Sequence, residues 1–277
     1  MAIDQQKLQN EYTFTGRGTA AELVADLDQV ALLAKKLKGR ATLIRWIALA
    51  VFLMLLASAI LFGGSLIALA IFVPIVLLIC SFFAGGSSIL HDRAEYLRLI
   101  LNMLQQDAGT RGRFEVLLRL RAKPETISEG PVPNNQSVKQ KFLRDSWLSL
   151  SARLSDGTVI SESCTDLIRR RTRKNARGKT KTKDKRTCLL RVQLNYDSGR
   201  YGDAASAAAA LKNPFRLAGL AQMKEFRSTD QGLAMKTILK NNPTVAATHS
   251  ANQAMLLGAY RILNLARQRV TATGGTK

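Results

Sequence analysis

An uncharged stretch of 45 residues, from Trp46 to Leu90, has the sequence WIALAVFLMLLASAILFGGSLIALAIFVPIVLLICSFFAGGSSIL. Two nearly pure apolar runs, residues 44–62 and 65–84, are separated only by two glycines and dominate this region. Each run is long enough to cross a hydrocarbon core about 30 Å thick as a helix rising about 1.5 Å per residue. The sequence therefore predicts a transmembrane helical hairpin over residues 44–84. A wedge held in one leaflet is the alternative, because the turn is very short.

Basic residues flank the predicted hairpin on both sides, and its turn carries none. Because Lys and Arg are enriched in cytoplasmic loops, we expect a multi-pass protein of a bacterial inner membrane with both termini in the cytoplasm. The residues expected at the membrane interface are Lys35, Lys36, Lys38, Arg40, Arg45, Trp46 and Arg93.

The whole pattern predicts an α+β membrane protein made of five segments. An N-terminal cytoplasmic segment contains an amphipathic helix that begins at a capping box, Thr19-Ala-Ala-Glu22. The hairpin and a juxtamembrane helix come next, followed by a cytoplasmic antiparallel β-rich domain and by a long C-terminal helix with a tail. The boundaries of these five segments are 1–43, 44–84, 85–110, 111–242 and 243–277.

The β-rich domain is predicted from a change of hydrophobic period. From Phe114 to Leu120 apolar residues alternate with polar ones, which is typical of a strand with one exposed face. Residues 148–154 and 190–196 show the same alternation, whereas 222–229 and 233–240 are weaker strand candidates. The proline-containing region between 122 and 147 is expected to be a loop. Five or six strands favour a sandwich or a partly open barrel.

The formal net charge of +21 is concentrated in the second half of the chain. Residues 169–186, RRRTRKNARGKTKTKDKR, hold eleven basic residues and one acid between two predicted strands. We expect a long β-hairpin whose self-repelling charges bind a polyanion. The predicted polyanion-binding residues are Arg169, Arg170, Arg171, Arg173, Lys174, Arg177, Lys179, Lys181, Lys183, Lys185 and Arg186.

No recognised catalytic or phosphate-binding motif occurs in the sequence, and its three cysteines do not form a disulfide framework. We therefore expect no enzyme activity, no cofactor, no metal and no small-molecule substrate. The predicted function is that of a membrane-anchored scaffold or adaptor that associates with the lipid bilayer and forms homo-oligomers. Its basic hairpin would bind an acidic protein surface, anionic lipid or nucleic acid. The alternatives are a subunit of an oligomeric channel or secretion assembly, and a membrane tether for nucleic acid or ribosomes.

Overall fold

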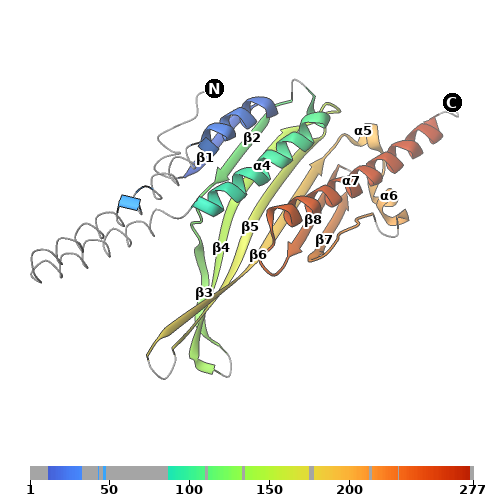
Figure 1. Ribbon diagram of the computed structural model, residues 1–277. Coiled ribbons are helices and arrows are strands. Elements are labelled where there is room, and N and C mark those ends of the chain that lie inside the picture. The colour runs from blue at the N-terminus through green and yellow to red at the C-terminus, as the bar shows by residue number, and fades with distance from the viewer. Residues whose placement is uncertain are drawn as a thin grey trace, which may run out of the picture.

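The computed structural model describes residues 12–32, 43, 46–47, 87–109, 112–132, 135–174, 178–211, 214–229 and 231–274. These residues form one antiparallel sheet of eight strands, with helices packed against it (Figure 1). The strands are β1 (Thr13–Gly18), β2 (Phe114–Arg119), β3 (Glu125–Val132), β4 (Asn135–Arg153), β5 (Val159–Lys174), β6 (Thr180–Asn195), β7 (Ala221–Thr229) and β8 (Gly232–Leu239). The helices are an unlabelled one over residues 20–32, α4 (Ser87–Ala108), α5 (Ser198–Tyr201), α6 (Ala204–Ala210) and α7 (Val245–Gly274).

The strand order is β1-β2-β4-β5-β6-β8-β7, and β3 pairs with β4 beside this path. The described strands thus form one open layer whose two ends are β1 and β7. The predicted sandwich or partly open barrel is therefore wrong. A second sheet is not needed, because α4 and α7 cover the apolar side of the first one (Figure 1).

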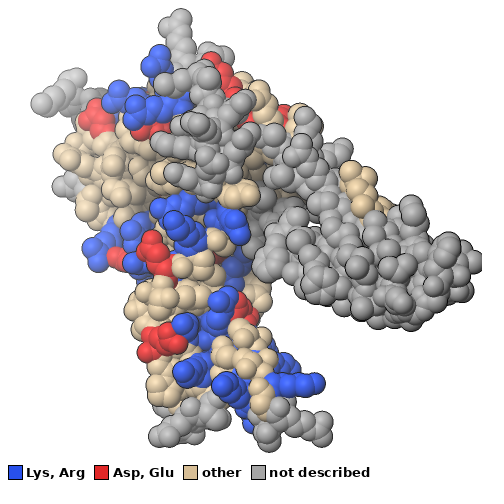
Figure 2. Space-filling model, turned by 90° about the vertical axis from the view of Figure 1, so that its left-hand side faces the viewer, with Lys and Arg blue, Asp and Glu red and all other residues tan. Residues whose placement is uncertain are grey.

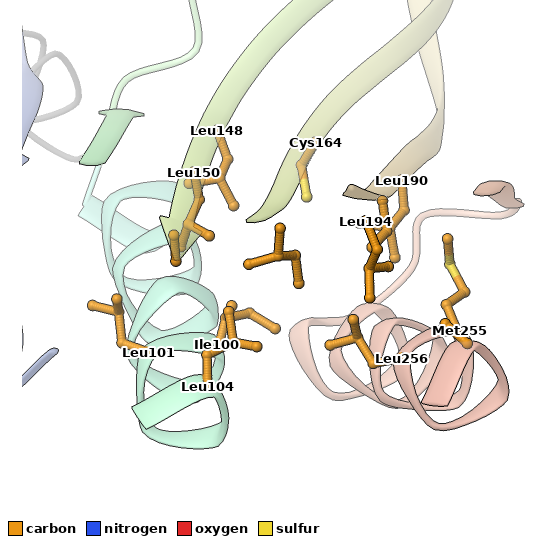
Figure 3. Packing of buried hydrophobic residues seen from close by; sticks show 14 of the residues in the cluster. Ile100, Leu101, Leu104, Leu148, Leu150, Cys164, Leu190, Leu194, Met255 and Leu256 are labelled. Atoms are coloured by element: carbon orange, nitrogen blue, oxygen red, sulfur yellow. The ribbon is translucent and has the colours of Figure 1, made fainter. Parts of the chain in front are cut away.

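Alternation along the strands separates a helix-covered face from an open face. On the helix-covered face, Leu148, Cys164 and Leu190 are buried and point toward the helices α4 and α7 (Figure 3). Residues at alternate positions, such as Ser149 and Arg191, are exposed on the open face. This is the period of two that a strand imposes on its side chains.

The prediction of a membrane-spanning fold needs correction. Among the residues that the structure describes, no helix combines the length and the apolar character needed to cross a membrane. The long helices α4 and α7 are amphipathic, and their apolar sides are buried in the core with the sheet. The predicted hairpin, residues 44–84, lies outside the described residues except for Trp46 and Ile47. A multi-pass protein of the inner membrane with cytoplasmic termini is therefore not supported.

The local signals for helices agree better with the structure. The capping box is confirmed, because the Thr19 N–H donates to Glu22 Oε2 (2.9 Å) and the Glu22 N–H donates to Thr19 Oγ1 (3.4 Å). The helix that follows contributes Leu23 and Leu27 to the core, and α4 contributes Leu97. Both helices therefore pack against the sheet as part of the core.

The region expected to be a loop is the main difference within the sheet. It contains β3 and the first half of β4, which pair with each other from Glu125 to Val132. The register shifts between Thr126 and Ser128 and again between Pro131 and Val132. A proline is tolerated at an edge strand or at such a bulge, because the missing N–H removes no necessary ladder bond.

Candidate polyanion-binding face

The predicted basic residues lie on two paired strands that extend past the helices. β5 and β6 pair antiparallel without a register shift from Val159 to Lys174, which agrees with the expected hairpin. We call the part from Arg169 to Lys174 of β5 and from Thr180 to Arg186 of β6 the basic arm. It protrudes from the helix-covered part of the molecule in Figure 1, and Lys and Arg side chains gather on the protruding end in Figure 2. Of the predicted residues, only Arg177 lies outside the described part of the chain.

The register divides these cations between the two faces of the arm. Cys164 points to the helices, and Arg169, Arg171 and Arg173 each lie an odd number of residues beyond it, so they are on the open face. Their partners across the hairpin are Lys185, Lys183 and Lys181 in the same order. We call these six residues the cation ladder. It consists of three rungs, each a pair of facing cations.

The other face of the arm carries fewer cations, namely Arg170, Lys174 and Arg186, together with the one acid of the arm, Asp184. There Arg170 faces Asp184, and its Nε and Nη2 donate to the two carboxylate oxygens at 2.9 and 2.8 Å. These hydrogen bonds lower the pKa of Asp184 and raise the pKa of Arg170. The next rung toward the tip is a pair of threonines, Thr172 and Thr182, whose hydroxyls lie 3.4 Å apart. Asp184, the single acid of the arm, therefore pairs with Arg170 on the face opposite the cation ladder.

The cation ladder has no such compensation within the described residues. None of the ion pairs found there involves any of its six members, and Arg171 Nε donates to the neutral Gln140 side chain at 2.9 Å. Like charges directly opposite each other in a sheet are destabilising by roughly 0.2–1 kcal/mol per pair. An anion bound over the rungs would remove this repulsion.

An apolar concavity adjoins the ladder where the arm meets the rest of the sheet. It has a volume of about 480 Å³, and Arg169 and Lys185 of the first rung line it. Phe142 of β4 pairs directly with Arg169, and its side chain is 42% exposed. Leu167 and the exposed Ile127 add further apolar surface, and Lys240 adds a third cation to the lining.

A buried group of charges fixes the base of the arm to the helices. Arg186 donates from Nη2 to the Pro243 carbonyl at 2.9 Å, and its Nη1 lies 3.7 Å from Asp166. Asp166 is also 3.5 Å from Arg93 of α4, which donates to Asp145 at 2.5 Å. Burial raises the pKa of Asp166, and the two guanidinium groups oppose this effect. The arm therefore begins at a rigidly connected point of the sheet.

Arg93 is the one expected interface residue whose role the structure changes. It is buried in the core and its guanidinium lies 5.3 Å from the centre of the Trp147 ring. Trp46 is described and is 65% exposed. The other expected interface residues, Lys35, Lys36, Lys38, Arg40 and Arg45, lie outside the described residues.

A second buried polar group lies between the two long helices and the sheet. Glu162 Oε1 accepts a hydrogen bond from the Tyr96 hydroxyl at 2.6 Å, and its Oε2 accepts one from Asn252 Nδ2 at 2.9 Å. Burial raises the pKa of Glu162 to about 7. The group is enclosed in the core, so we assign it to stability and not to catalysis.

The two cysteines near this group are free thiols. Cys164 pairs with Leu190, whereas Cys188 pairs with Asp166, so the cysteines are diagonal neighbours on one face and not direct partners. Burial raises the pKa of the Cys164 thiol. Within the described residues, no group of three or more His, Cys, Asp or Glu side chains is placed to hold a metal ion.

Comparison with protein-family models, curated proteins and solved structures gives no match for this chain. The geometry of the arm is therefore what indicates a function. The charges of the arm are evident in the sequence, but Phe142 is not, because it is far from Arg169 in the chain and adjacent to it only in the sheet. Extending the strand predicted at residues 148–154 back to residue 138 would have placed this aromatic ring beside the cations.

Proposed function

We propose that this protein binds a polyanion through the cation ladder and does not catalyse a reaction on it. The observation that carries the proposal is the placement of six cations on one face of a hairpin, as three facing pairs without an acidic partner among the described residues. Successive rungs are separated by two residues, or about 6.8 Å along a strand. A ligand that contacts all three rungs must therefore carry several negative charges in a row.

Binding of this kind depends strongly on salt. The ladder residues at the rungs beyond the first are exposed, so their charges are screened over a Debye length of about 8 Å at physiological ionic strength. A polyanion that contacts them releases condensed counterions, and its affinity falls steeply as salt is added. Nucleic acid, acidic protein surfaces and anionic lipid all meet this charge requirement.

The test is a salt titration of the full chain against inorganic polyphosphate, which has repeated charges and no other recognition feature. In the ladder variant, Arg171→Gln with Lys183→Gln, we expect weaker binding and a salt dependence reduced by about a third, because two of six cations are lost. The control is Lys139→Gln on β4 with Lys174→Gln on β5, which removes the same charge from the other face of the sheet.

We expect the control variant to retain the affinity and the salt dependence of the unchanged protein. Equal losses in the two variants would show that net charge alone governs binding, and the proposal would then be wrong. The self-assembly expected from the sequence stays a prediction, and the mass of the full chain in solution is the measurement that tests it.

A further inference from the structure

We infer that the polyanion bound by the cation ladder is a single-stranded nucleic acid, whose bases stack on Phe142 in the adjoining concavity. This inference rests on the proposed function and identifies the ligand of the same face. It follows from the position of an exposed aromatic ring beside the first rung, which charge alone does not require.

The row of residues across the base of the arm contains both parts of such a site. Phe142 on β4, Arg169 on β5 and Lys185 on β6 are consecutive partners across three strands, and all three line the concavity. Directly opposite residues in a sheet have Cβ atoms about 5 Å apart. A nucleotide whose phosphate contacts Arg169 or Lys185 therefore has its base within reach of the Phe142 ring.

The size of the concavity fits an apolar group of this kind. Its volume of about 480 Å³ is within the range of small-molecule sites, and Leu167 and Ile127 give it an apolar lining next to the phenyl ring. Proteins that bind single strands combine a basic track for the backbone with aromatic side chains for the bases. The ladder would be the track, and Phe142 the stacking platform.

The geometry also distinguishes a single strand from other polyanions. In a duplex the base faces are stacked on one another inside the helix, so an aromatic ring at the protein surface cannot stack on them unless a base is flipped out. Polyphosphate offers charge but no flat apolar group for the concavity. The strand is expected on the open face of the arm. The charge of Arg170 on the other face is compensated by Asp184, whereas the six cations of the open face have no acidic partner among the described residues.

The experiment measures binding of the full chain to labelled ligands by fluorescence anisotropy. These are a 20-nucleotide RNA strand, the same strand as DNA, the same strand with abasic sites, and inorganic polyphosphate. Acidic peptides and vesicles with anionic lipid are tested beside them. We expect Phe142→Ala to weaken binding of the base-containing strand roughly tenfold and to leave binding of the abasic strand and of polyphosphate unchanged. We expect Phe142→Trp to restore the affinity.

The matched control is Leu117→Ala, which truncates another 40% exposed apolar residue of the open face, on β2 and away from the concavity. Phe142→Leu keeps an apolar side chain without an aromatic ring, so its failure to restore affinity would support stacking. If Phe142→Ala and unchanged protein bind the base-containing strand equally, the inference is wrong.

The design separates this failure from failure of the proposed function. Loss of polyphosphate binding in Arg171→Gln with Lys183→Gln, together with no effect of Phe142→Ala, would preserve the ladder and exclude base stacking. Tight binding of acidic peptides or of vesicles with anionic lipid, without binding of either single strand, would also overturn the inference. Binding of RNA and DNA with different affinities would support it and show which sugar the site prefers.

Discussion

The helix-covered end of the sheet and the basic arm are built from the same strands but treat charge in opposite ways. In the covered part, Arg93 lies within hydrogen-bonding or ion-pair distance of Asp145 and Asp166, and these three side chains are buried. In the arm, cations of β5 and β6 face one another on the open side, and the one acid is on the other side. The comparison shows that buried charges are paired with opposite charges inside the fold. The exposed cations of the arm are left without acidic partners among the described residues, and a bound polyanion could supply the missing negative charge.

The largest effect is expected from breaking the compensated side. Arg93→Met leaves the buried Asp145 carboxylate without its cation and leaves Asp166 with Arg186 alone. Breaking a buried ion pair in this way typically costs about 3–5 kcal/mol of unfolding free energy. Urea denaturation of the full chain measures this change. Arg98→Met is the matched control, because Arg98 pairs with Asp28 on the surface, where ion pairs contribute about 0–1 kcal/mol. Equal losses for the two variants would contradict the distinction between the two regions.

A second prediction concerns the pH dependence of the covered region. Burial raises the pKa of Glu162 to about 7 in the folded protein, whereas the ordinary pKa of a Glu carboxyl is 4.5. Between these two pH values the folded state therefore holds a proton that the unfolded chain has already lost. The stability associated with this proton is present below about pH 4.5 and is lost as the pH rises to about 7. The difference amounts to about 3 kcal/mol.

The measurement is the unfolding free energy of the unchanged protein and of Glu162→Gln between pH 4.5 and 7. We expect the advantage of the unchanged protein over the variant to fall by about 3 kcal/mol across this range. Asn252 is able to adapt to the amide, because its buried Oδ1 has no hydrogen-bond partner among the described residues. A difference between the unchanged protein and Glu162→Gln that stays constant from pH 4.5 to 7 would exclude the assignment.

The smallest effect is expected in the arm and has the opposite sign. Lys183→Gln removes the cation that faces Arg171, so we expect a gain of roughly 0.2–1 kcal/mol in unfolding free energy at low salt. The gain should shrink at high salt, because exposed charges are screened. Asp184→Asn, the neighbour on the other face, removes the attraction to Arg170 and should instead destabilise slightly. A loss of stability in Lys183→Gln would show that Lys183 makes a favourable interaction in the folded protein, which would contradict repulsion between Lys183 and Arg171.

The sequence predicts a strand well where one face of that strand is buried and the other is exposed, because apolar and polar residues then alternate. The period of two from Phe114 to Leu120 and from residue 190 onward marks strands whose alternate side chains are buried under helices. The first half of β4 and all of β3 lack this contrast, because they lie largely in the exposed part of the sheet, and the prolines of β3 favoured a loop. The membrane assignment came from hydropathy alone and is not supported by any helix in the described part of the chain.

The candidate site also has a part that the sequence predicts and a part that only the fold shows. The charges of the arm are visible in the sequence because they are contiguous, and the hairpin follows from the strands on either side of them. The contacts of Phe142 with Arg169, and of Arg93 with Asp166, join residues far apart in the chain and depend on the register of β4 and the position of α4. One signal was present for the buried cluster: Asp166 lies in phase with the buried Ile160 and Cys164. Asp145 gave no such signal, because the register shift between Ser146 and Leu148 puts it out of phase with Leu148 and Leu150.

The central claim is that the polyanion contacts one face of the arm and not the other. Acetylation of surface lysines in the full chain, followed by mass spectrometry with and without polyphosphate, tests it at single residues. The account predicts protection of Lys181, Lys183 and Lys185 by polyphosphate and unchanged reactivity of Lys139 and Lys174 on the other face. Equal protection of both sets, or protection of the second set alone, would contradict it.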